Sequence, residues 1–353
     1  MKVLFFGIYN KSDPVNARTR ILLEGLKKRG WEIDECNTPV SSLWRFWFLL
    51  KEYRKTSEDY DVMFLAYAGG QTISILAKIL SKKKIVADPI VSLYDTMVFD
   101  RKKVSRFSFK AAYYYVLDWL LCRLCDVVIM DTAANADYFR RTFKSPVSKF
   151  RRLFIGTEEK TMRPAAAEEK GDKFIVHFHG FFIPLHGVEH IVKAAKLLEE
   201  EDVVFNIIGR GQTYKQVRKV SEDIGVKNVN FIDPVAYDKI PDYIKRADVV
   251  LGIFGDTGKA SRVVPNKVYD AVAMGKAVLT ADTPAVRELF SDGENCLFCR
   301  PADPEDLAAK IRTLKNNPGL LEKIAAGGYK LFREKLRPEI IAAEFEKILR
   351  ETV

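Results

Sequence analysis

Residues 264–279 read VPNKVYDAVAMGKAVL, and they predict a helix that runs directly into a buried strand. Lys267 lies at the start of this helix, and Asp270 follows one turn further along. Exposed N–H groups and the helix dipole favour phosphate at a helix start, and Lys267 adds a positive charge there. Asp270 can accept hydrogen bonds from sugar hydroxyls. The stretch therefore predicts a binding site for a nucleotide sugar.

The same order of strand and helix recurs along the chain outside this stretch. Residues 2–7 are a short apolar strand pattern ending at a glycine, and a helical pattern over residues 18–29 follows. Residues 174–180 repeat that strand, followed by a helical pattern over 188–201 and a strand over 203–208. This alternation predicts an α/β protein of two Rossmann-like, doubly wound parallel-sheet domains, which bind ligands at the carboxyl ends of their strands.

Length and composition agree with two domains. The chain has 353 residues, of which 48% are hydrophobic, as in an ordinary globular protein. Residues 156–172 lack apolar periodicity, which is typical of an exposed connection. We therefore expect an N-terminal domain over residues 1–155, a linker over 156–172, a C-terminal domain over 173–335 and a final helix within 336–353.

Short motifs disfavour several other classes of protein. Gly209-Arg210-Gly211 lacks the third glycine of a dinucleotide fingerprint, and no G-x-x-x-x-G-K-[ST] phosphate loop occurs. The most apolar window, residues 111–130, contains three charged residues, so we expect a helix and a strand there rather than a membrane span.

The cysteines indicate a reducing, cytosolic setting. Five cysteines are an odd number, and they occur in a long chain without a signal peptide. Two C-x-x-C spacings occur, at Cys122 and Cys125 and at Cys296 and Cys299. We expect these thiols to pack in the core rather than to share a zinc ion.

The order of features from His177 to Asp303 resembles that of family 4 glycosyltransferases. The features are Gly180 and Gly187 around a turn, Gly209-x-Gly211 after a strand, Ala247-Asp248, the helix with Asp270, Glu288, and Gly293-Glu294-Asn295. The resemblance implies a GT-B fold, with two Rossmann-like domains facing a central cleft and the final helix packed back on the first domain. It also implies retaining, metal-independent sugar transfer without a cofactor, and it places Asp270 on the family's ribose-holding glutamate.

The resemblance extends the donor site to neighbouring loops of the C-terminal domain. The loop 254–262 is rich in glycine and basic residues, and it precedes the helix that carries Asp270. Backbone amides and cations there would meet the donor diphosphate, although a flexible surface loop is the alternative. The expected donor-binding residues are Gly209, Arg210, Gly255, Lys259, Arg262, Lys267, Asp270 and His186.

The chain departs from the family pattern within this site. The first carboxylate of the family's E-x7-E pair falls on Arg262, so only the second carboxylate remains, as Asp270. The family's diphosphate-binding arginine and lysine fall on Phe181 or Phe182 and on His186. The lost charge can come from Arg210, Lys259, Arg262 or Lys267. His186 can also donate to a phosphate, although a structural role fits a lone histidine in a turn.

The N-terminal half contains no histidine, so the family's catalytic histidine has no counterpart there. Asp88 follows a strand in the corresponding region, and we expect it to face the donor sugar and to stabilise positive charge at the anomeric carbon. Capping of the next helix is the alternative role for Asp88. The expected acceptor-side residues are Gly7, Asn10, Arg18 and Asp95, together with the rest of the loop 7–13.

The positive charge of the chain lies in its first half. The net charge is +10, and residues 1–155 hold 27 Lys and Arg against 16 Asp and Glu. Aromatic and basic residues alternate in the segments 44–51 and 106–110, which favours a membrane surface over nucleic acid or a merely basic face.

Together these patterns predict a glycosyltransferase at the cytoplasmic face of the cell membrane, acting in polysaccharide biosynthesis. The expected acceptor is a glycan or a polyprenyl-phosphate-linked glycan, and no nucleic acid or metal partner is expected. Two alternatives stay open: a nucleotide-sugar epimerase or hydrolase on the same scaffold, and a non-catalytic, membrane-associated protein that binds sugar nucleotides.

Overall fold

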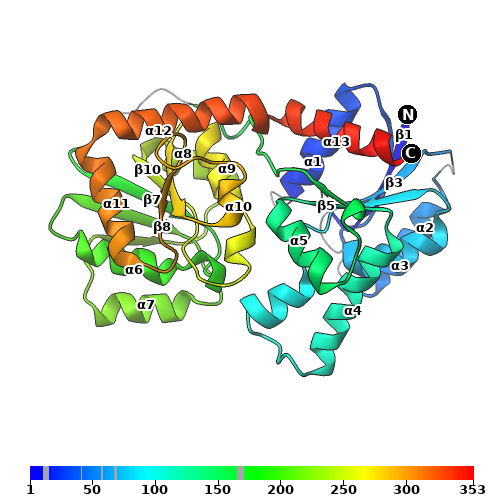
Figure 1. The fold of residues 1–353 in the computed structure, drawn as a ribbon, viewed down its shortest axis with the longest axis horizontal. Coiled ribbons are helices and arrows are strands. Elements are labelled where there is room, and N and C mark those ends of the chain that lie inside the picture. Colours follow the sequence, from blue (N-terminus) through cyan, green and yellow to red (C-terminus); the bar gives the residue numbers. More distant parts are fainter. Residues whose placement is uncertain (11–15, 41, 57–58, 67–69, 165–170) are drawn as a thin grey trace. The chain divides into compact units, whose positions relative to one another are not determined.

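The computed structural model describes residues 1–10, 16–40, 42–56, 59–66, 70–164 and 171–353. They form two compact units, Met1–Gly156 with Pro338–Val353, and Thr157–Arg337. Each unit contains a six-stranded sheet whose named strands pair in parallel (Figure 1). Lys11, Ser12 and Asp13 of the expected acceptor loop lie outside the described residues, as do residues 165–170 of the expected linker.

The first unit has the strand order β2-β1-β3-β4-β5-β6. Its strands are β1 (Lys2–Gly7), β2 (Glu32–Asn37), β3 (Val62–Leu65), β4 (Lys84–Ala87), β5 (Val127–Met130) and β6 (Phe150–Arg152). Its helices are α1 (Ala17–Lys28), α2 (Trp44–Tyr53), α3 (Gly70–Leu80), α4 (Phe109–Leu124), α5 (Ala133–Thr142) and α13 (Pro338–Thr352). A π-helical turn, η2 (Asp95–Asp100), and a 3-10 turn, η3 (Val147–Lys149), complete the unit.

Alternate side chains of the central strands of this unit enter two different layers. Phe5 and Phe64 contact Phe345 of α13, with ring centroids 6.5 and 4.7 Å apart. Their strand neighbours Phe6 and Met63 belong to a core that includes side chains from α2, α3, α4 and α5. This period of two is what a sheet covered on both faces requires. Helices α1 and α13 pack against each other in the layer that contains Phe345.

The second unit has the strand order β12-β11-β10-β7-β8-β9. Its strands are β7 (Phe174–His179), β8 (Val203–Ile208), β9 (Val229–Ile232), β10 (Val249–Leu251), β11 (Ala277–Ala281) and β12 (Leu297–Cys299). Its α-helices are α6 (Val188–Leu197), α7 (Tyr214–Asp223), α8 (Ile240–Arg246), α9 (Asn266–Ala273), α10 (Pro284–Arg287), α11 (Pro304–Asn316) and α12 (Pro318–Leu331). Its short turns are η4 (Pro184–His186), η5 (Tyr237–Lys239), η6 (Ala260–Arg262) and the π-helical η7 (Phe332–Leu336).

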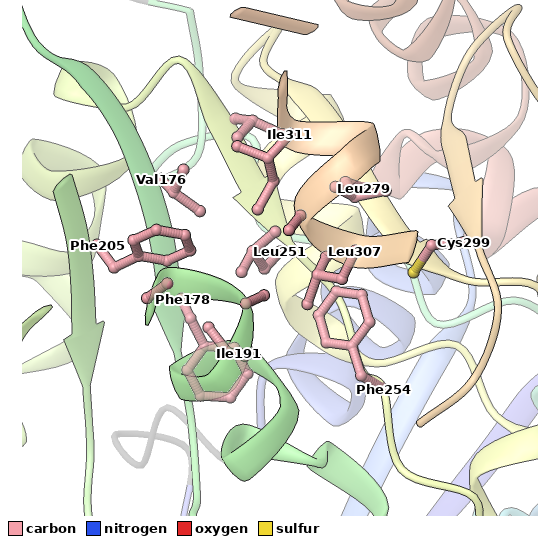
Figure 2. Close-up of a cluster of buried hydrophobic side chains, with 14 of the residues drawn as sticks. Val176, Phe178, Ile191, Phe205, Leu251, Phe254, Leu279, Cys299, Leu307 and Ile311 are labelled. Carbon is pink, nitrogen blue, oxygen red and sulfur yellow. The ribbon is translucent and has the colours of Figure 1, made fainter. Parts of the chain in front are cut away.

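A dense apolar core lies on one face of the second sheet. Phe205, Leu251 and Leu279 project from their strands towards Ile191 of α6 and Ile311 of α11 (Figure 2). Phe178 of β7 belongs to the same core, whereas its neighbours His177 and His179 point to the opposite face. That opposite face therefore contains polar groups where the first face is wholly apolar.

The strand order reverses direction once in each sheet. In the second unit the reversal lies between β7 and β10, and in the first unit it lies between β1 and β3. Open α/β sheets bind ligands outside the carboxyl ends of the strands at such a point. The fold therefore places the segments that follow β7 and β10 at the expected binding edge, and the predicted fold class is confirmed.

The segment expected to be an exposed linker is partly packed. Thr157 and Met162 are buried, and Glu159 forms an ion pair of 3.1 Å with Arg337. The polar composition of residues 156–172 did not indicate this packing, because the buried side chains are too few to produce a periodic pattern.

Candidate functional site

Glycines bring together the loops that follow β7, β8 and β10. A Cβ at Gly209 would lie 1.9 Å from the Gly180 carbonyl oxygen, and a Cβ at Gly255 would lie 2.4 Å from the Pro184 oxygen. The Phe254 N–H donates to the His186 carbonyl at 3.1 Å. Any larger residue would separate these backbones, so Gly209 and Gly255 hold the three loops in contact.

Lys267 lies in the first turn of α9 at this edge of the sheet. Its side chain is buried, at 4% exposure, although lysine is almost never buried without a partner. The Lys267 Nζ lies 3.5 Å from His186 Nε2 and 4.2 Å from the centroid of the Phe178 ring. The structure thus brings together two of the predicted donor-site residues, Lys267 and His186.

Burial decides the charge of this amine. Loss of hydration lowers the pKa of Lys267 from 10.5 to about 7, against the opposing effect of the Asp270 carboxylate. The amine is therefore close to half protonated at neutral pH. A bound anion would raise the pKa again, because it replaces the hydration that the ammonium has lost.

Asp270, one turn along α9, is held by groups of its own unit. It is 2% exposed, and its Oδ1 accepts hydrogen bonds from the hydroxyls of Thr157 and Tyr237. Its Oδ2 lies 3.7 Å from His179 Nε2. The Asp270 carboxylate is thus an internal anion, and at 2% exposure it can meet a ribose hydroxyl only if the side chains around it move.

Two stacked histidines extend this polar cluster beneath α9. His177 and His179 share a hydrogen bond of 3.0 Å between Nε2 and Nδ1, and His177 stacks on Tyr243 of α8. Burial lowers the pKa of both imidazoles, most strongly for His177, and Asp270 partly offsets the effect at His179. Both rings are neutral at pH 7, so Lys267 supplies the variable positive charge of the cluster.

The other predicted cations take different positions. Arg210 forms an ion pair with Asp233 and lies over the Tyr214 ring, with its guanidinium carbon 4.2 Å from the ring centroid. Arg262 folds against Gly258, where a Cβ would lie 3.1 Å from its guanidinium. Lys259 is buried at the start of η6. Lys267 therefore contacts His186, whereas Arg210 contacts Asp233 and Tyr214.

The first unit contains a closed ion pair at the corresponding edge of its sheet. Arg18 Nε and Nη2 donate to Asp88 Oδ2 and Oδ1 at 2.6 and 3.1 Å, and both side chains are buried. The same guanidinium also donates to the carbonyls of Phe154 and Leu153. The structure therefore pairs Asp88 with Arg18, whereas the sequence predicted that Asp88 faces the donor sugar.

The remaining acceptor-side residues are distributed around this pair. Gly7 ends β1 beside the Tyr9 ring, and the Asn10 carbonyl accepts from Asn16 Nδ2 at 3.0 Å. Asp95 is buried at the start of η2, and its N–H donates to Ser92 Oγ at 2.9 Å.

Over the described ranges, no group of three or more His, Cys, Asp or Glu side chains is placed to hold a metal ion. None of the helices described is both long and apolar enough to cross a bilayer. All five cysteines are free and buried, which confirms the predicted core packing.

Four residues of the cluster were missed by sequence reasoning. The spacing of His177 and His179 is the one available signal, because alternate residues at a strand end share a face. Thr157 and Tyr237 are 113 and 33 residues from Asp270, and no pattern linked them to it.

The fold defines a class of protein with two Rossmann-like units, and the buried cluster lies in the second of them. The family model for glycosyl transferases group 1 matches residues 159–331. A putative colanic acid biosynthesis glycosyl transferase of Escherichia coli, WcaI, is 30% identical over 144 residues, which are 40% of this chain and 35% of that protein. The uncharacterized glycosyltransferase MJ1069 of Methanocaldococcus jannaschii is 21% identical over 329 residues, covering 90% of this chain and 82% of its own.

A solved structure supports the fold over nearly the whole chain. The crystal structure of Anabaena Alr3699/HepE with UDP and glucose superposes on this chain with a TM-score of 0.77 and 15% sequence identity. The match covers 99% of this chain and 100% of the HepE chain. Residues 159–331 belong to the group 1 glycosyl transferases, as the resemblance to family 4 predicted.

We predict that Lys267→Met stabilises the protein at low pH. The folded-state pKa of Lys267, about 7, lies below the unfolded value of about 10.5, so protonation below pH 10 favours the unfolded chain. The variant should gain roughly 2–5 kcal/mol in unfolding free energy at pH 6, and progressively less towards pH 10. Urea unfolding at both pH values measures this gain, with the exposed Lys323→Met as control. A variant less stable than the wild type at pH 6 would contradict the assigned burial cost.

We predict that Asp88→Leu lowers the unfolding free energy by about 3–5 kcal/mol, because it leaves the Arg18 guanidinium buried and unpaired. The double variant Arg18→Met with Asp88→Leu should be more stable than Asp88→Leu alone. Asp137→Leu, which removes surface ion pairs with Arg140 and Arg141, should lower the unfolding free energy far less than Asp88→Leu does. Unchanged stability in Asp88→Leu, together with lost turnover, would instead favour direct contact of Asp88 with substrate.

Proposed function

We propose that this protein transfers a sugar from a nucleotide-sugar donor to a hydroxyl of a glycan or lipid-linked glycan acceptor. The observation that carries the proposal is the buried Lys267 amine in the first turn of α9, beside His186 and at the reversal point of the sheet. An amine that is costly to bury, and is placed where α/β sheets bind ligands, is suited to an anionic ligand.

The donor diphosphate is the anion that fits this position. The N-terminus of α9 has no side-chain cap, so its amides can donate to phosphate oxygens. Lys267 would neutralise charge on the departing diphosphate, and His186, whose Nδ1–H donates to the Phe181 carbonyl, would accept from the amine through Nε2 at 3.5 Å and hold it in place. In this way Lys267 replaces the two cations that the family carries on the loop after β7. UDP is the nucleotide that we favour as part of the donor, because the HepE structure contains UDP.

The other donor-side residues have supporting roles in this proposal. Gly209 and Gly255 hold the loops in contact, and Asp270 with its hydrogen-bond partners fixes the start of α9 and the polarity around Lys267. Arg210, Lys259 and Arg262 contribute longer-range positive potential. The retaining outcome and the lack of a metal requirement follow from the family resemblance.

The acceptor belongs to the first unit in this proposal. Gly7, Asn10, Arg18 and Asp95 lie on its sheet edge or the segments that follow it, and Asp88 positions Arg18. The name of the WcaI relative refers to colanic acid, a polysaccharide. The excess basic charge of the first unit suits a phosphate-containing acceptor at the cytoplasmic membrane face.

We predict that UDP binding at pH 8 takes up close to one proton. In the free protein Lys267 is mostly neutral at this pH, because its pKa is about 7, and the bound diphosphate would restore the ammonium. Calorimetry in two buffers of different ionisation enthalpy measures the uptake. The affinity should fall with rising pH above 7, and Lys267→Met should lose both the uptake and at least tenfold in affinity.

A nucleotide panel and a turnover assay complete this test. Lys323→Met should bind UDP as the wild type does, and GDP, dTDP and ADP should bind more weakly. Release of UDP from a UDP-sugar should require an acceptor. Failure of every nucleotide to bind would contradict the donor site, whereas UDP binding without release on any glycan or polyprenyl-phosphate acceptor would favour the non-catalytic alternative.

A further inference from the structure

Helices α2, α3 and α4 lie in one layer of the first unit, and their inner sides share a core. Leu49 of α2, Ile73 of α3 and Leu121 of α4 are members of the same buried cluster on one face of the sheet. The Tyr53 hydroxyl of α2 donates to the Leu80 carbonyl of α3 at 3.0 Å, and α3 packs closely along α4. All three helices therefore cover the same face of the first sheet (Figure 1).

Each of the three helices presents an apolar stripe outward. Trp44, which is 69% exposed, is followed on the same side of α2 by Trp47 and Phe48. Ile75 and Ile79, the latter 75% exposed, are one turn apart on α3. These side chains point away from the shared core, which is the reverse of the pattern expected for a helix on a water-facing surface.

The segment 106–109 at the start of α4, called the tip, is the most exposed apolar part of this layer. Phe107 is 92% exposed and Phe109 is 98% exposed, and Tyr113 and Val116 continue the stripe along α4. Fully hydrated phenylalanines contribute nothing to the core. Exposed apolar side chains thus occur in groups on three helices of one layer, whereas single exposed apolar residues are ordinary.

Basic residues surround these stripes. The segments 43–55, 70–84 and 101–124, which contain the three helices and the tip, hold fourteen Lys and Arg and two carboxylates, of which Asp118 is buried. Lys51 lies over the Trp47 ring at 5.3 Å, and Arg106 lies over the Phe107 ring at 5.9 Å. A surface that combines aromatic side chains with cations matches the headgroup region of an anionic bilayer.

We propose that the outer face of the α2–α3–α4 layer docks on an anionic lipid bilayer, with Phe107 and Phe109 inserted and α3 contributing Ile75 and Ile79. This inference rests on the proposed function, whose acceptor is lipid-linked, and it assigns the membrane contact to one face of the first unit. It also assigns a contact to α3, which has no aromatic-basic motif of the kind found in the segments 44–51 and 106–110.

The test is sedimentation of the full chain with vesicles of phosphatidylcholine, either alone or with about one third phosphatidylglycerol. The wild type should bind the anionic vesicles and should be released by high salt, because surface charge attraction is screened. The variants Trp44→Ser with Trp47→Ser, Ile75→Ser with Ile79→Ser, and Phe107→Ser with Phe109→Ser should each weaken binding at least fivefold. Val147→Ser with Leu197→Ser, which changes exposed apolar residues outside the three helices, should bind as the wild type does.

Three results would overturn the inference. They are absence of binding to the anionic vesicles, wild-type binding by the α3 variant, and a self-associated chain whose dimer the same variants dissociate. UDP binding by each variant separates this inference from the proposed function. A chain that binds UDP but no vesicles contradicts the docking face alone, whereas one that binds vesicles but transfers no sugar contradicts the proposed function alone.

Discussion

The burial of the Lys267 amine is the constraint on which the site depends. Water is removed from the amine by Phe178, Gly180 and the first turn of α9, while the Asp270 carboxylate lies one turn along the same helix. The carboxylate is itself engaged by Thr157, Tyr237 and His179, so it cannot move to form a close pair with the amine without losing those contacts. The cluster therefore holds an amine whose charge is readily restored by an anion.

Each unit contains a buried cation, but the hydrogen-bond partners of the two cations differ. In the first unit, the Arg18 guanidinium is satisfied by one carboxylate and two carbonyls, so it functions as a structural link between α1 and the segments after β4 and β6. In the second unit, Lys267 Nζ has a long contact of 3.5 Å with His186 Nε2 and no carboxylate in a close pair among the described residues. A closed pair adds rigidity, whereas an under-satisfied amine adds binding capacity. Both sheets reverse direction, and this contrast is the reason that we propose the donor site in the second unit.

Much of the fold could be predicted from the sequence because the strands and helices depend on local patterns. Strand 2–7 and strand 203–208 were predicted with the bounds that the structure has, since apolar runs between polar loops identify parallel strands. Lys267 and His186, which the structure places side by side, were both predicted as donor-site residues because a helix start and a turn are local features. The partners of Asp270 were not, since Thr157 and Tyr237 reach it only through the packing of distant segments. Asp88 was assigned to the sugar because its sequence shows a carboxylate at a strand end but not the buried guanidinium 70 residues away.

The most direct measurement of the central claim is a crystal structure of this protein with UDP bound at pH 7. The β-phosphate is predicted to lie within hydrogen-bond distance of Lys267 Nζ, over the first turn of α9. A diphosphate held instead by Arg210 or by the loop 254–262, with Lys267 still buried and in contact only with His186 and Phe178, would contradict it.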